Sequence, residues 1–132
     1  MEIQSYSFDG EGMSPVYKNS TWMVGIKNWK PANDLGAIDC IERHNLTDEL
    51  FVLLNGTCTL LYAHEGDEGL RFGTVVMEPF RVYSIPRSMW HNTITTRDTK
   101  LILIEDSSTS SENSDVLTLD DQQIAEVKSL FS

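Results

Sequence analysis

The sequence has few cysteines and few basic residues, and it has no long hydrophobic run. Two cysteines in 132 residues are fewer than a small, disulfide-stabilised secreted domain usually carries. The longest apolar run, Leu50–Leu54, has the length of a buried strand and is far shorter than the roughly 20 residues that span a bilayer. Met1–Gly10 is acidic and polar, which predicts no secretory signal. We therefore expect a cytoplasmic protein with no membrane contact.

Positive charge is scarce. Ten lysines and arginines face twenty acidic residues, and the net charge is −10. Binding to nucleic acid phosphates or anionic lipids requires clustered basic side chains, and the sequence contains no such cluster. The composition therefore predicts no nucleic acid partner. The net charge carries no information about the fold.

Short apolar runs separated by turn residues dominate the chain from Thr21 onward. Asn55-Gly56 predicts a two-residue hairpin between two such runs, and Gly66-Asp67-Glu68-Gly69 predicts a looser one. Pro79 and Pro86 fall where strands should end. We expect eight strands, at Trp22–Ile26, Ala37–His44, Leu50–Leu54, Thr57–His64, Leu70–Met77, Arg81–Ile85, His91–Thr95 and Lys100–Glu105.

This pattern predicts a single all-β domain, a small antiparallel barrel of six to eight strands with a jelly-roll-like path. A loosely structured arm (1–20) precedes the barrel (21–105), and a polar surface loop (106–117) and a helix (118–132) follow it. Thr118 is the expected helix cap, with Asp120 and Asp121 in the first turn. We expect this helix to pack on the outside of the barrel or on a partner subunit.

Two segments carry the chemical signal. In the first, Cys40, Glu42 and His44 alternate along a predicted strand and share one face, and Glu49 opens the next strand. Cys40 itself is expected to be a core residue. The second segment ends at His91. Imidazole and carboxylate groups that converge from neighbouring strands suit Fe, Mn, Ni or Zn.

The first segment resembles the first motif of the cupin superfamily. That motif is Gly, five residues, His-x-His, three or four residues, Glu, six residues and Gly. Gly36, His44, Glu49 and Gly56 stand at the expected places. Glu42 replaces the first histidine, and a carboxylate is also a competent metal ligand.

The second segment resembles the second cupin motif, which is Gly, five residues, Pro-x-Gly, two residues, His, three residues and Asn. Pro86 and His91 match it. Phe80, Ser88 and Thr95 stand where Gly, Gly and Asn are usual. The whole resemblance implies a small, single-domain cupin with the conserved β-barrel.

The resemblance also implies a metal site. In cupins that hold a metal, the motif histidines and the glutamate are the ligands, which correspond here to Glu42, His44, Glu49 and His91. Two carboxylates would neutralise a divalent ion. Without an ion, their mutual repulsion and poor solvation would raise the pKa of one of them.

Several functions remain open at this level. A metal-binding cupin could act as an enzyme on a small polar molecule, because isomerase, epimerase, lyase and dioxygenase chemistry all occur in this fold. Alternatively, a metal-free cupin could be a ligand-binding module or a sugar-nucleotide isomerase. We also expect a homodimer, because cupin barrels commonly pair through sheet edges.

Overall fold

A computed structural model describes residues 1–131, which form ten strands, two short 3-10 helices and one α-helix. Most of the strands lie where the apolar runs predicted them. The elements are β1 (Met13–Lys18), β2 (Trp22–Asn28), η1 (Pro31–Asn33), η2 (Leu35–Ala37), β3 (Cys40–His44), β4 (Glu49–Asn55), β5 (Cys58–Gly66), β6 (Gly69–Val76), β7 (Val82–Ile85), β8 (Trp90–Thr95), β9 (Lys100–Asp106), β10 (Ser114–Thr118) and α1 (Asp121–Ser129).

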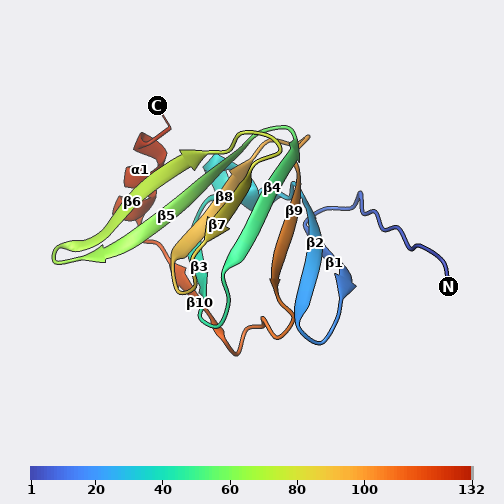
Figure 1. The fold of residues 1–132 in the computed structure, drawn as a ribbon. Helices are drawn as coiled ribbons and strands as arrows, with labels where there is room; N and C mark the ends of the chain where they lie inside the picture. Colours follow the sequence, from blue (N-terminus) through green and yellow to red (C-terminus); the bar gives the residue numbers. More distant parts are fainter. Residues whose placement is uncertain (132) are drawn as a thin grey trace.

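The strands form two five-stranded antiparallel sheets (Figure 1). The strand orders are β1-β2-β9-β4-β7 and β10-β3-β8-β5-β6. The predicted antiparallel all-β fold with a C-terminal helix is confirmed, with ten strands instead of six to eight, and the two sheets are not closed into a barrel. Each sheet keeps two edge strands with one hydrogen-bonded neighbour, so packed side chains hold the two sheets together.

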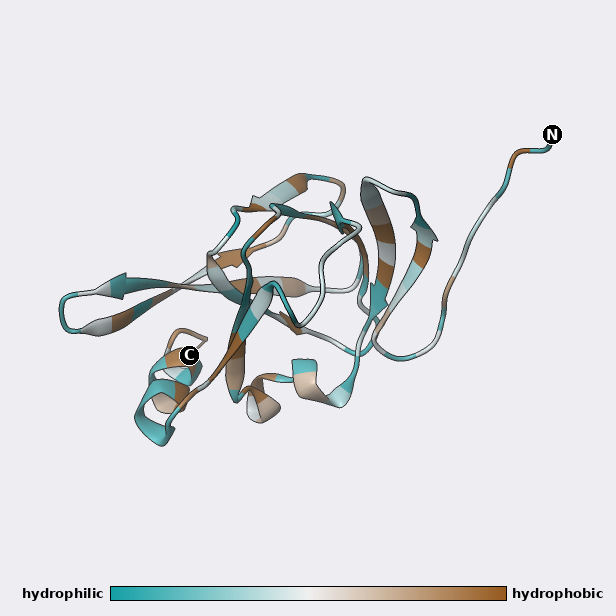
Figure 2. Ribbon diagram, turned by 90° about the horizontal axis from the view of Figure 1, so that it is seen from below, coloured by the Kyte–Doolittle hydropathy of each residue, from teal (hydrophilic) through white to brown (hydrophobic). Residues whose placement is uncertain are grey.

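Strand alternation divides the apolar side chains between two clusters, and Figure 2 shows hydrophobic and hydrophilic residues alternating along several strands. One cluster contains residues of both sheets: Met23, Phe51, Leu53, Cys58, Leu60, Met77, Ile85, Leu101 and Leu103. The other joins β3, β5 and β8 to the C-terminal segment: Ile38, Ile41, Leu61, Ala63, Trp90, Ile94, Leu119 and Val127.

Three sequence expectations about secondary structure are wrong in detail. The arm (1–20) contains β1, and the polar loop (106–117) contains most of β10. Both are edge strands, whose side chains need little hydrophobicity because backbone hydrogen bonds to β2 and β3 hold them in place. The strand predicted from Ala37 begins only at Cys40, because residues 35–37 form η2.

The helix begins later than predicted. Thr118 ends β10, and the cap is Asp120, whose carboxylate accepts a hydrogen bond from the Gln123 backbone in a capping box. Val127 is fully buried, so the helix packs on its own subunit. Ser132, the last residue of the predicted helix, lies outside the described residues. Among residues 1–131, no helix has the length and apolar character needed to cross a bilayer.

Of the two hairpins predicted at glycine turns, the structure has one. Asn55-Gly56 joins β4 to β5, which lie in different sheets, so the expected hairpin there is wrong. Gly56 has a φ of 74°, and this left-handed conformation carries the chain from one sheet to the other. The hairpin predicted at Gly66-Asp67-Glu68-Gly69 is confirmed: Asp67 and Glu68 form its two-residue turn, and Gly66 pairs with Gly69.

Candidate metal centre

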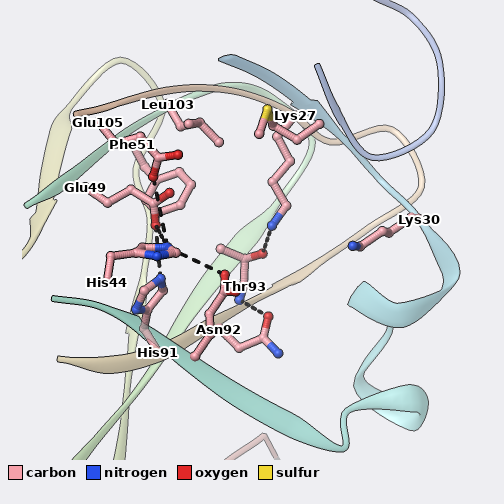
Figure 3. A pocket seen from close by; sticks show the side chains of 12 residues that line it. Lys27, Lys30, His44, Glu49, Phe51, His91, Asn92, Thr93, Leu103 and Glu105 are labelled. Atoms are coloured by element: carbon pink, nitrogen blue, oxygen red, sulfur yellow. Dashed lines mark hydrogen bonds and ion pairs between the residues drawn. The ribbon is translucent and has the colours of Figure 1, made fainter. Parts of the chain in front are cut away.

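The four predicted ligands lie around one pocket between the sheets (Figure 3). Glu42 and His44 come from β3, and His91 comes from β8, where it pairs directly with Glu42. Glu49 is the first residue of β4 in the opposite sheet. The alternation of β3 turns Ile41 into the cluster under the helix and leaves its neighbours facing the pocket.

The side chains approach one another closely. Oε1 of Glu49 lies 3.0 Å from Nε2 of His91 and 3.7 Å from Nε2 of His44. Oε1 of Glu42 lies 3.9 Å from the same His44 nitrogen. The side chains of Glu49 and His91 are only 7 % and 3 % exposed, whereas that of Glu42 is 46 % exposed. Glu42 therefore stands at the rim, and the other three residues lie deeper.

Hydrogen bonds fix how both imidazole rings are turned. Nδ1 of His91 lies 2.9 Å from the carbonyl oxygen of Met89, and because a carbonyl only accepts, Nδ1 carries a proton. Nδ1 of His44 lies 2.8 Å from the hydroxyl of Ser114 on β10. Both rings thus direct Nε2 at Glu49. In metal sites, the same outer contacts orient the ligating histidines.

A fifth group, Glu105, was missed by the sequence reasoning. Its Oε2 lies 4.0 Å from Nε2 of His44 and is buried without a hydrogen-bond partner. His44, Glu49 and Glu105 could together hold an ion, as could Glu42, His44 and His91. The available signal was the alternation of β9, in which Leu101 and Leu103 face inward and Glu105 follows on the same face.

Burial and charge shift the pKa values of these groups. Burial, the neighbouring Glu49 carboxyl and the charge of Glu42 raise the pKa of Glu105 to about 8. Burial alone would also raise the pKa of Glu49, but the hydrogen bond and charge of His91 hold it below its ordinary value. The pKa of His91 is raised, because its contact with Glu49 outweighs the opposite effect of burial. The carboxyl group of Glu105 is therefore protonated near neutral pH.

The donor set fits a divalent ion. A neutral His91 protonated on Nδ1 would direct a lone pair from Nε2 at the Glu49 carboxylate, which is a repulsive contact at 3.0 Å. Either a second proton on the ring or a cation between the two atoms removes that repulsion. Two donors bound at right angles to one ion, each about 2.1 Å away, lie roughly 3 Å apart. The unpartnered Oε2 of Glu105 offers a further donor.

The opposite side of the pocket is basic. Lys27 and Lys30 line the same space, which has a volume of about 240 Å³. Nζ of Lys27 donates a hydrogen bond of 2.9 Å to the hydroxyl of Thr93 (Figure 3). Burial lowers the pKa of Lys27, while the negative charges of Glu49 and Glu42 oppose that shift. The sequence reasoning singled out neither lysine.

The two cysteines differ. Cys58 is fully buried. Cys40 is half-buried and lines a second pocket of about 120 Å³ with Asn33 and Lys30, so its placement in the core was wrong. The reason is that β3 turns this face toward the pocket instead of toward packed apolar side chains.

Comparison with known proteins identifies the fold. The sequence matches no protein-family model and no curated protein. The structure resembles a cupin-2 domain protein from Shewanella frigidimarina, with a TM-score of 0.53, 16% identity and coverage of 75% of this chain and 84% of that one. It also resembles KdgF from Halomonas, with a TM-score of 0.56, 15% identity and coverage of 76% and 80%.

A third similar structure is a variant of PAC13 from Streptomyces, solved with uridine. It gives a TM-score of 0.62 at 8% identity and covers 93% of this chain and 97% of that one. Likeness at such low identity concerns the path of the backbone and not the chemistry. With ten strands in two facing sheets and one helix on the outer face of the second sheet, this chain is a small domain with the cupin fold.

Proposed function

We propose that this protein binds a divalent metal ion and uses it to bind or transform a small polar molecule. His44, Glu49 and His91 would hold the ion, with Glu42 and Glu105 as further carboxylates at its two sides. The observation that carries the proposal is the direction of both imidazole Nε2 atoms toward one buried carboxylate oxygen, at 3.0 Å and 3.7 Å. A bound ion would polarise a carbonyl or hydroxyl group of the bound molecule.

Side chains of the protein would transfer protons and limit the access of water. Without an ion, Glu105 holds a proton on its carboxyl group near neutral pH, because its pKa is raised to about 8. A bound cation would lower this pKa and favour release of the proton. A carboxyl group that exchanges its proton near neutral pH is suited to give or take a proton beside a reacting oxygen or carbon atom. Phe51 and Leu103 line the same pocket and limit the access of water. Glu105, which would transfer the proton, thus lies beside the residues that would hold the metal.

Metal binding is tested by titrating the protein, first stripped with a chelator, with Mn²⁺, Fe²⁺, Ni²⁺ and Zn²⁺. We expect one ion per chain, and we expect His91→Ala to weaken binding at least about 100-fold because it removes a ligand and its orienting contact. His64→Ala is the matched control, since His64 is exposed and lies outside the pocket. Equal affinity of the His91→Ala variant and the wild type would refute the proposal.

A metal-free ligand-binding cupin or sugar-nucleotide isomerase is the second candidate. One observation favours it: the protonated His91 ring and the Glu49 carboxylate form a complete ion pair without any ion. The structural likeness to PAC13, solved with uridine, suggests a nucleoside as the probe. Uridine binding that persists in excess chelator and disappears in Glu49→Gln would support this candidate over the metal proposal.

A further inference from the structure

Lys27 is an inward-facing cation whose charge is not paired at close range. It lies on β2 in line with the buried residues Met23 and Gly25, so its side chain enters the space between the sheets. Its Nζ donates to the neutral hydroxyl of Thr93. Among residues 1–131, no carboxylate lies within 4.0 Å of this nitrogen, although Glu42 and Glu49 line the same pocket. An ammonium group has three donors, so capacity for a ligand remains.

Asn33, which contacts Thr93 as Lys27 does, has a side-chain carbonyl oxygen that lacks a hydrogen-bond partner. The Asn33 side chain amide donates hydrogen bonds to the carbonyl and hydroxyl oxygens of Thr93, which fixes its orientation. Its Oδ1 is buried without a partner, although the residue is only 3 % exposed. Asn33, Lys27 and Lys30 line the adjoining pocket of about 120 Å³. A buried, unpartnered acceptor is costly unless a ligand or water uses it.

We infer that this end of the pocket binds the carboxylate of a small organic acid. Lys27 and Lys30 would take the negative charge, and Oδ1 of Asn33 would accept a hydrogen bond from a hydroxyl group of the same molecule. A carboxylate fits better than a phosphate, because a phosphate would place two negative charges on one group near Glu42 and Glu49 and would need a larger set of donors. The inference names the ligand class of the proposed metal site and therefore rests on that proposal.

The size of the pocket restricts the acid further. A volume of about 240 Å³ is below the roughly 300–1,000 Å³ of drug-sized ligand sites. The carboxylate end lies at Lys27, and the histidines lie at the other side (Figure 3). A ligand that reaches both needs a second oxygen a few bonds from its carboxylate. Short hydroxy acids and dicarboxylic acids have this form.

The test is a calorimetric titration of the Zn²⁺-loaded protein and of the chelator-treated protein. The probes are glycolate, lactate, malonate and succinate, with glycolamide and lactamide as neutral counterparts, all at one ionic strength. We expect at least one acid to bind the Zn²⁺-loaded form at least about tenfold more tightly than its amide, since a charge-assisted hydrogen bond is lost in the amide. Lys27→Met should lose that preference, and Lys27→Arg should keep part of it.

Two further variants keep the result interpretable. Lys128→Met makes the same charge change on α1, outside the pocket, and should bind the acids like the wild type. Lys30→Met changes an exposed residue, and it should weaken acid binding about threefold even if Lys27→Met does not fold. Far-UV circular dichroism checks the folding of each variant.

Zn²⁺ titration of the same proteins separates the two proposals. Lys27→Met should bind Zn²⁺ at least as tightly as the wild type, because an ammonium group is no ligand and its loss removes a positive charge near the ion. Zn²⁺ binding without any lysine-dependent preference for acids over amides, in either form of the protein, would overturn the carboxylate site alone. Failure of Zn²⁺ and the other ions to bind would overturn the metal proposal, while a lysine-dependent preference would still support the carboxylate site.

Discussion

Two residues of the second motif adopt a backbone conformation that favours glycine. Phe80 and Ser88 have φ values of 66° and 65°, and both stand where the cupin motif usually has glycine. The fold thus imposes the left-handed conformation whichever side chain is present. For a residue with a Cβ, this conformation costs roughly 1–2 kcal/mol. The motif glycines are therefore explained by turn geometry and not by the metal.

This strain predicts a stabilising substitution. Phe80→Gly should raise the free energy of unfolding by about 1 kcal/mol, because the 76 % exposed ring contributes little packing and glycine tolerates a positive φ. Urea denaturation monitored by tryptophan fluorescence measures the change. Phe80→Ala is the control: it removes the same ring but keeps a Cβ, so it should stabilise far less than the glycine variant. Equal effects of the two variants would mean that strain at this position is unimportant.

The carboxyl of Glu105 predicts how stability depends on pH. With its pKa raised to about 8, the folded chain binds more protons than the unfolded chain between about pH 4.5 and pH 8. Stability must then fall as the pH rises through this range. The raised pKa of His91 acts in the same direction above pH 6.5. We expect the melting temperature of the metal-free protein to decrease from pH 5 to pH 8.

Glu105→Gln isolates this effect, since an amide has similar shape and no titration. Its melting temperature in excess chelator should change less with pH than that of the wild type. Glu112→Gln, on an exposed turn, is the control and should follow the wild type. Identical pH profiles for Glu105→Gln and the wild type would show that Glu105 ionises normally in the folded state.

At the scale of elements, the C-terminal helix depends on its first turn. The Asp120 carboxylate accepts a hydrogen bond of 2.8 Å from the Gln123 backbone N–H, and Oε1 of Gln123 accepts one of 2.9 Å from the Asp120 backbone N–H. The helix covers the apolar outer face of β3, β5 and β8 through Val127. The cap therefore supports the packing of a whole sheet face.

Asp120→Ala should lower the free energy of unfolding by about 1 kcal/mol, because it leaves backbone donors of the first turn without a partner. The neighbouring Asp121→Ala is the matched control. It removes one acidic group from the same turn but no capping contact, so a loss of only about 0.3–0.5 kcal/mol is expected. Chemical denaturation of both variants measures the difference, and equal losses would assign the effect to charge instead of capping.

At the scale of the molecule, the edge of the first sheet presents exposed aromatic side chains. Tyr17 of β1 packs its ring 5.1 Å from that of Trp22 and 6.1 Å from that of Tyr6 in the arm. All three are at least 36 % exposed. The arm runs away from the body of the domain (Figure 1). An exposed strand edge with such neighbours is suited to pairing with another chain.

We propose that the protein is a homodimer joined at this edge. Light scattering at micromolar concentration should give the mass of two 14.9 kDa chains. Tyr17→Glu should shift the equilibrium to monomer, because it places a charge in the interface. Val76→Glu, on the opposite sheet's edge strand β6, should stay dimeric. A monomeric wild type, or dissociation by the β6 substitution alone, would contradict this arrangement.

Local features of the sequence were enough to predict most strands. Apolar runs and turn residues are separated by only a few positions, so periodicity places β2, β4, β5, β6, β8 and β9 nearly correctly. The spacing of Glu42, His44 and Glu49 along two successive strands likewise places them together. The edge strands β1 and β10 were missed, because backbone hydrogen bonds to neighbouring strands hold them and their side chains alternate only weakly.

The sequence by itself therefore determined the β-rich class and the strand pattern, since both depend on side-chain alternation over short stretches, while the resemblance to the cupin motifs implied that His91 joins the three site residues of the first motif. Only the tertiary structure decided the open pair of sheets and the pocket's other charges. Glu105 and Lys27 lie on β9 and β2, which pair with each other in one sheet and face His44 and His91 across the pocket. Contacts between residues so far apart in the chain arise from sheet packing, which no local pattern of residues encodes.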